Sequence, residues 1–257
     1  MTFTDPATHR RRGPVTGPIV YDYRQPARDW HGWLLDHVEW RPGAIVLDAG
    51  SGPGAYVPAL LARVGAEGQV VALDLSLERA RAVPVGAHRV QGDVMALPFR
   101  DECFDGVLAM HMLYHLADVA GAAQELRRVL RPGGVLLAST NGERDQLELV
   151  DLFLACGGRD PEALGGGGFT LENGGAYLER AFAGVELRDW RDSELVVTDA
   201  DAVVSTFASL RYTLEPALRP DVPWYAFLAR VRSAVETEIR RTGAFRIGEH
   251  GGLFICL

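Results

Sequence analysis

Short apolar runs alternate with segments of helical period through the first half of the chain. The apolar runs that predict buried strands lie at 44–47, 70–73, 104–110 and 135–138, and a weaker strand is expected at 88–91. The segments with helical spacing between them lie at 56–64, 77–83 and 119–130. Apolar strands that alternate with helices are typical of βαβ units, in which helices cover both faces of a parallel sheet. We therefore predict an α/β fold with a doubly wound, mostly parallel sheet.

The pattern differs on the N-terminal side of this region. Residues 1–18 are punctuated by proline and glycine and show no period, which predicts an arm. Aromatic residues then gather in 21–40, where Trp30, Trp33 and His37 follow helical spacing. We expect an amphipathic helix there, ended by the Pro-Gly pair at 42–43.

After residue 140 the alternation of apolar runs and helical segments becomes less regular. The expected helices lie at 147–155, 172–182, 199–210 and 224–241. The expected strands lie at 185–190 and 195–197, followed by a closing hairpin of 245–247 with 253–255. We accordingly divide the chain into an arm with an aromatic helix (1–40), a core (41–142) and a remainder (143–257). The remainder carries a helical insertion at about 198–242 and the hairpin.

The most distinctive stretch is the glycine turn at residues 46–56. An apolar run ends in Asp48, and Gly50, Gly52 and Gly54 follow at every second position before a helical pattern begins. Glycine has no Cβ and tolerates positive φ, so such a turn brings bare backbone close to a ligand. On its own, a glycine-rich turn is a weak signal.

Polar residues follow the other strands as well. Asp74 ends the second strand, where a carboxylate can accept hydrogen bonds from a ribose diol. Asp93 follows the third strand, where it could meet a purine edge, and Met110-His111 end the fourth strand. An Asp after a strand is most often a turn or helix cap, so only the joint placement indicates a binding crevice.

Composition narrows the function classes. The chain has 34 acidic against 26 basic residues, a net charge of −8 and a pI of about 5.4, which argues against binding nucleic acid through phosphates. Three scattered cysteines suggest neither a disulfide framework nor a metal site, and fit a reducing cytoplasm. No apolar run is long enough for a membrane span, and no signal peptide is expected at the N-terminus. We expect a cytoplasmic monomer or homodimer with no metal.

These residues match a known family in its order. The chain resembles the class I S-adenosylmethionine-dependent methyltransferases, and is closest to the branch with the ubiquinone- and menaquinone-biosynthesis enzymes. The matching pieces are VLDAGSGPG at 46–54, ALD at 72–74, GDVMALPF at 92–99, FDGV at 104–107 and RVLRPGG at 128–134. The match covers roughly 43–140 and leaves both flanks without an activity-defining pattern.

The resemblance implies a Rossmann-like, seven-stranded sheet with a helical cap, and S-adenosylmethionine as cofactor, with S-adenosylhomocysteine as product. It assigns the methionine end of the cofactor to the glycine turn, the ribose and adenine to the next two strand ends, and a backbone contact to the fourth. The implied cofactor-binding residues are Asp48, Ala49, Gly50, Gly52, Gly54, Asp74, Leu75, Asp93, Val94, Met110 and His111. The third glycine comes one residue too early for the turn of nicotinamide enzymes, which makes a dehydrogenase less favoured.

The reaction implied is methyl transfer to an O, N or C atom of a small molecule, which rests on proximity and orientation. His111 or His115 could serve as the general base. A reaction that uses no general base is an equally open alternative. The candidates for an acceptor pocket are Tyr21, Tyr23, Tyr114 and Phe169, and each could instead pack cap against core. Two other functions stay open. One is an RNA methyltransferase, and the other is a cofactor-binding protein on the same fold that does not methylate.

Overall fold

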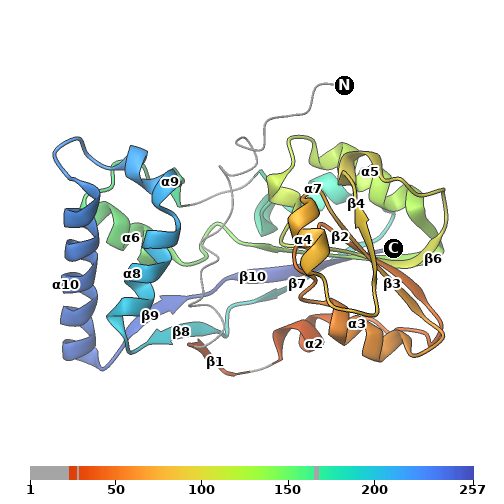
Figure 1. The fold of residues 1–257 in the computed structure, drawn as a ribbon, viewed down its shortest axis with the longest axis horizontal. Coiled ribbons are helices and arrows are strands. Elements are labelled where there is room, and N and C mark those ends of the chain that lie inside the picture. Colours follow the sequence, from red (N-terminus) through yellow and green to blue (C-terminus); the bar gives the residue numbers. More distant parts are fainter. Residues whose placement is uncertain (1–22, 28, 165–167) are drawn as a thin grey trace. The chain divides into compact units, whose positions relative to one another are not determined.

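The computed structural model describes residues 23–27, 29–164 and 168–257, and the chain divides into two compact units (Figure 1). Among the described residues, the sheet unit comprises 29–140, 168–189 and 252–257. The helical unit comprises 23–27, 141–164 and 190–251. The predicted core at 41–142 falls almost entirely in the sheet unit, and the predicted insertion at about 198–242 falls in the helical unit.

The sheet unit is built on a seven-stranded sheet with the strand order β4-β3-β2-β5-β6-β10-β7. The strands are β2 (Ile45–Ala49), β3 (Gln69–Asp74), β4 (His88–Gln91), β5 (Phe104–Met110), β6 (Leu130–Asn141), β7 (Val185–Trp190) and β10 (Gly251–Cys256). Pairs β2–β3, β2–β5, β3–β4 and β5–β6 are parallel. The predicted doubly wound, mostly parallel sheet is confirmed.

The chain order explains where this sheet presents its functional edge. From β2, the chain adds β3 and then β4 on one side of the sheet. It then returns and adds β5 and β6 on the other side of β2. The strand order therefore switches between β2 and β5, and ligands of such sheets bind beyond the carboxyl ends at this point.

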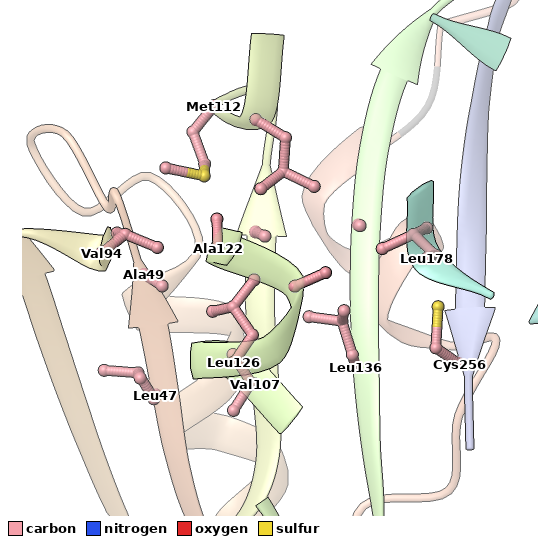
Figure 2. Close-up of a cluster of buried hydrophobic side chains, with 14 of the residues drawn as sticks. Leu47, Ala49, Val94, Val107, Met112, Ala122, Leu126, Leu136, Leu178 and Cys256 are labelled. Atoms are coloured by element: carbon pink, nitrogen blue, oxygen red, sulfur yellow. The ribbon is translucent and has the colours of Figure 1, made fainter. Parts of the chain in front are cut away.

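Five α-helices lie in the described part of the sheet unit. They are α2 (Trp30–Leu35), α3 (Val57–Val64), α4 (Leu77–Ala82), α5 (Val119–Val129) and α7 (Leu171–Leu178). The side chains of Ala122 and Leu126 on α5 join Leu47, Val107 and Leu136 of the strands in one buried cluster (Figure 2). Each of these five side chains is fully buried, so the period-3.6 pattern at 119–130 reports the face that meets the sheet.

The helical unit has a second core of its own. Its antiparallel sheet pairs β8 (Glu194–Val197) with both β1 (Arg24–Gln25) and β9 (Phe245–Gly248). Its helices are α6 (Leu147–Cys156), α8 (Ala200–Ser209), α9 (Arg211–Leu214) and α10 (Trp224–Thr242). The rings of Phe153, Phe207 and Phe227 meet edge to face at the centre of this core.

The predicted C-terminal hairpin is wrong. Strand β9 belongs to the three-stranded sheet, whereas β10 lies between β6 and β7 in the seven-stranded sheet. Gly184 and Leu257 exchange both backbone hydrogen bonds (3.2 and 2.9 Å), the pattern of an antiparallel pair beside β7. Two apolar runs around a glycine loop look like a hairpin locally, but β10 buries almost every residue, which requires neighbours on both sides.

Candidate functional site

Four positions predicted to bind the cofactor lie at one edge of the seven-stranded sheet. Strands β4, β3, β2 and β5 are adjacent and parallel, so their carboxyl ends share this edge. The edge carries the glycine turn after β2 between Asp74 at the end of β3 and Met110 at the end of β5. Asp93 follows β4 on the far side of Asp74. The structure thus brings together the residues expected to bind the cofactor.

The glycine turn is tied to the neighbouring strand through its backbone. The N–H groups of Gly50 and Ser51 both donate to the carbonyl of Leu73, at 2.8 and 2.9 Å. The N–H of Gly52 donates to Oδ2 of Asp74 at 2.8 Å. These bonds fix the turn over the end of β3.

Two of the turn's glycines are required for different reasons. Gly50 has φ of +70°, and a Cβ there would lie 3.0 Å from three atoms of the Met112 side chain. Gly52 has φ of +55°, and a Cβ there would meet nothing within 4 Å. The first glycine allows close packing beneath the turn, and the second leaves space beside it that a ligand could fill.

Asp74 has a second role that the sequence did not indicate. Its Oδ2 accepts from Gly52, and its Oδ1 accepts from the N–H of Ser76 at 2.8 Å. The carboxylate therefore joins the glycine turn to the start of α4, and still has lone pairs for a ligand. Leu75 follows it with its side chain 49% exposed, which is unusual for a leucine beside a buried strand end.

Asp48 is the most unusual ionisable group at this edge. It is only 1% exposed, and its Oδ2 has no hydrogen-bond partner among the described residues. Burial, with a smaller contribution from the nearby negative charge of Asp74, raises the pKa of Asp48 to about 7. A buried carboxyl group without a partner is suited to receive a cationic group of a ligand.

The segment after β4 starts with a short 3-10 helix at Val94–Ala96. Oδ1 of Asp93 caps it by accepting from the N–H of Met95 at 2.9 Å. The Asp93 side chain is exposed, whereas Val94 is buried. The exposed carboxylate and the neighbouring backbone could bind a polar edge of a base.

The end of β5 bends sharply at His111. This residue has φ of +51°, a conformation that side chains other than glycine adopt uncommonly. Its N–H donates to both the carbonyl and the hydroxyl oxygen of Ser139, at 3.0 and 3.1 Å. Backbone strain of this kind costs about 1–3 kcal/mol and gathers at functional sites.

The two candidate bases lie in different surroundings. The half-buried His111 stands at the strand end itself. His115 is exposed in the 3-10 helix Leu113–His115, with its ring 4.5 Å from that of Tyr114. His111 is therefore the one that shares the edge with the glycine turn.

The four residues expected to line an acceptor pocket come from different parts of the chain. Tyr21 lies outside the described residues. Tyr23 belongs to the helical unit, where it packs against the second core. Phe169 is 1% exposed and meets Tyr177 and Phe254, and Tyr114 is buried, so both belong to the core of the sheet unit.

Two residues that support the site carry no signal in the sequence. Met112 packs under Gly50, and Ser139 holds the bend at His111. A methionine and a serine carry no specific signal, because their roles depend on contacts between segments far apart in the chain.

None of the described helices has both the length and the apolar character needed to cross a membrane. No group of three or more His, Cys, Asp or Glu side chains that could hold a metal ion occurs in the described part of the chain.

The comparisons agree with this geometry. A family model described as a methyltransferase domain matches residues 47–138, the segment that supplies all four strand ends. An uncharacterised protein from a Streptomyces fradiae transposon is 39% identical over 117 residues, covering 43% of this chain and 34% of that protein. Demethylmenaquinone methyltransferase of Desulfitobacterium hafniense is 32% identical over 120 residues, covering 43% of this chain and 47% of that enzyme. The matches thus span about a third to a half of these relatives.

Solved structures extend the likeness in fold. A protein from Anabaena variabilis, described as a methyltransferase from an antibiotic biosynthesis pathway, has a TM-score of 0.63 at 19% identity. The alignment covers 88% of this chain and 96% of that one. At this identity the likeness establishes the Rossmann-like fold alone.

Proposed function

We propose that residues 47–138 form a class I S-adenosylmethionine-dependent methyltransferase domain and that the protein transfers a methyl group from S-adenosylmethionine to a small-molecule acceptor. The observation that carries the proposal is the shared edge of β4, β3, β2 and β5, where glycine turn and carboxylates converge. The bound cofactor would supply an activated methyl group on a sulfonium centre.

The residues at this edge fit each part of that cofactor. Asp48 offers a buried, unpartnered carboxylate oxygen for the α-ammonium group, and the space beside Gly52 admits the amino-acid chain. Asp74 would accept from the ribose hydroxyls, and the exposed Leu75 would cover the adenine face. Asp93 and the backbone at Val94 would bind the purine edge. We therefore retain these residues, with Ala49, Gly50, Gly54, Met110 and His111, as the proposed cofactor site.

The acceptor is proposed to be recognised by residues outside 47–138. The relatives named for methylating quinones match only 43% and 41% of this chain, so their acceptors do not carry over. The quinone enzymes support a small organic acceptor as a class. The excess of 34 acidic over 26 basic residues disfavours RNA as the acceptor.

Calorimetry with S-adenosylhomocysteine tests the cofactor site. The wild-type protein should bind it, and Asp74→Ala should weaken binding by at least about tenfold, since the ribose acceptor and the anchor of Gly52 are both lost. Asp105→Ala removes a carboxylate that pairs with Arg131 and Ile45, and should bind normally. Unchanged affinity of Asp74→Ala, or a wild-type protein that does not bind, contradicts the proposal. Binding without methyl transfer to any acceptor in a small-molecule panel would favour the non-methylating alternative.

We further propose His111 as general base when the acceptor must lose a proton, with His115 as the other candidate. His111 is favoured because it stands at the same sheet edge as the glycine turn. Once an acceptor is known, His111→Gln should lower kcat by about 100-fold or more while leaving S-adenosylhomocysteine affinity within about threefold. Full turnover in His111→Gln and in His115→Gln would show that neither acts as a base.

The proposed setting is the cytoplasm, with the protein as a monomer or homodimer. The described cysteines Cys103, Cys156 and Cys256 are free thiols, which suits a reducing compartment. Cell fractionation and light scattering of the purified protein check these two points, and recovery from an extracytoplasmic fraction would contradict the first.

A further inference from the structure

The segment between β4 and β5 carries the proposed purine contacts, but it contains little regular structure. Asp93 caps the 3-10 helix Val94–Ala96 at one end, and Leu97 follows at the other end. The chain then continues through Pro98 and Phe99 to the start of β5. The position of Asp93 and Val94 therefore depends on what holds this segment, here called the purine loop (residues 92–101).

A single side chain of helix α5 holds the second half of the purine loop. The guanidinium of Arg128 donates from Nη2 to the carbonyl of Leu97 (3.1 Å) and from Nη1 to the carbonyl of Phe99 (2.8 Å). Nη1 also donates to Oδ1 of Asp101 at 2.8 Å. Two backbone carbonyls and one side chain of the loop thus share one cation.

Glu125, one turn earlier on α5, completes the arrangement. Its Oε1 accepts from Nε of Arg128 and its Oε2 accepts from Nη2, both at 2.8 Å. Oε2 also accepts from the N–H of Leu97 at 2.9 Å. All five guanidinium N–H groups of Arg128 therefore have acceptors, and both backbone groups of Leu97 are bound to α5.

The electrostatics match this geometry. Hydrogen bonds with Arg128 hold the pKa of Glu125 below its usual range, and the same bonds raise the pKa of Arg128. The two side chains are 30% and 25% exposed, so the pair is only partly screened by solvent. A lysine cannot replace Arg128, because an ammonium group offers three donors without the planar fork.

We propose that Arg128 and Glu125 are positioning residues for purine recognition, which fix the loop that presents Asp93 and Val94 without touching the cofactor. The proposal rests on the proposed function. Leu97 ends the 3-10 helix that Asp93 begins, so a fixed Leu97 fixes the direction of the Asp93 carboxylate. Without this pair, the Asp93 carboxylate would still be present, but its orientation would vary.

Discrimination between two ligands tests this role. S-adenosylhomocysteine carries a 6-amino donor for Asp93, and S-inosylhomocysteine carries a carbonyl there. The wild-type protein should prefer the adenosyl ligand by about tenfold to hundredfold, the value of one hydrogen bond to a charged group. Arg128→Lys should reduce this preference at least about threefold, and Glu125→Gln should reduce it less. A variant that is only less stable would keep the same ratio of affinities at a temperature where it is folded.

Arg131→Lys is the matched control, because Arg131 follows closely in the chain but pairs with Asp105 instead of the loop. It should keep the wild-type preference. Amide hydrogen exchange of the ligand-free protein gives a second readout, in which Leu97 should exchange faster in Arg128→Lys than in Arg131→Lys. If folded Arg128→Lys keeps both the ligand preference and the exchange rate at Leu97, this proposal is overturned, but the proposed function is not. A wild-type protein that binds neither ligand overturns the proposed function and this inference with it.

Discussion

At the scale of single residues, two carboxyl groups depart most from their usual chemistry. Burial raises the pKa of Asp48 to about 7, and burial likewise raises the pKa of Asp145 in the helical unit to about 7. Asp145 differs from Asp48 in being satisfied, since it accepts from the N–H of His250 (2.9 Å) and from Nδ2 of Asn141 (2.8 Å). The two groups therefore share a pKa but not a proposed role.

We predict that ligand binding at Asp48 is coupled to loss of a proton. The α-ammonium group of S-adenosylhomocysteine would stabilise the ionised form of Asp48, so affinity should rise by about tenfold from pH 6 to pH 8. Calorimetry in buffers of different ionisation enthalpy measures the proton released. Asp48→Asn should abolish the pH dependence, whereas Asp145→Asn should retain it. A flat affinity in the wild-type protein would contradict this assignment of Asp48.

The free energy of unfolding should fall with rising pH, whereas the ligand affinity should rise. A carboxyl group whose pKa is 3.8 when unfolded and about 7 when folded leaves the folded protein holding more protons between these values. Each of the two groups therefore makes the free energy of unfolding fall as the pH rises from about 4 to 7. When the free energy of unfolding is measured by urea denaturation across this pH range, both Asp48→Asn and Asp145→Asn should flatten its pH dependence. This result separates the effect of the two groups on folding from the effect of Asp48 on ligand binding.

At the scale of elements, the C-terminal strand β10 is part of the sheet core. Phe254 is buried against Phe169, and its ring leaves no room for a side chain at Gly174. Phe245 on β9 packs instead against the hydrophobic cluster of the helical unit. The two strands thus serve different cores, although only Glu249 and His250 separate them in sequence.

Truncation of these two phenylalanines provides a test. Phe254→Ala should lower the free energy of unfolding by about 3–5 kcal/mol, because it empties a closely packed site. Phe245→Ala should lower the free energy of unfolding by less, because Phe245 is only half-buried. Urea denaturation of both single variants and the double variant measures their coupling. The effects should add within about 0.5 kcal/mol. A larger coupling would indicate the hairpin in which these side chains are neighbours.

The glycine turn shows how an element gains a function from its neighbours. The sequence identified its glycines and the carboxylates of Asp74 and Asp93. The structure adds that Asp74 anchors Gly52, that Met112 supports Gly50, and that Arg128 fixes the loop of Asp93. Each addition is a contact between residues distant in sequence, which no local pattern contains.

At the scale of the whole molecule, the family model matches a segment of one of the chain's two units and no part of the other. The matched segment 47–138 lies within the sheet unit. The helical unit has its own three-stranded sheet and its own core, and it contains the predicted insertion at about 198–242. The methyl donor is therefore better supported than the acceptor.

The sequence by itself predicted the mostly parallel sheet, its first five strands along the chain and the residues of the proposed cofactor site. These follow from local information: apolar runs set the strands, helical spacing sets α5, and residues at strand ends must meet at one edge. Only the tertiary structure decided that β10 joins the seven-stranded sheet, that Asp48 is buried without a partner, and that Arg128 holds the purine loop. Burial and long-range pairing decide these features, because the desolvation of a carboxyl group and the five acceptors of a guanidinium depend on segments that only folding brings together.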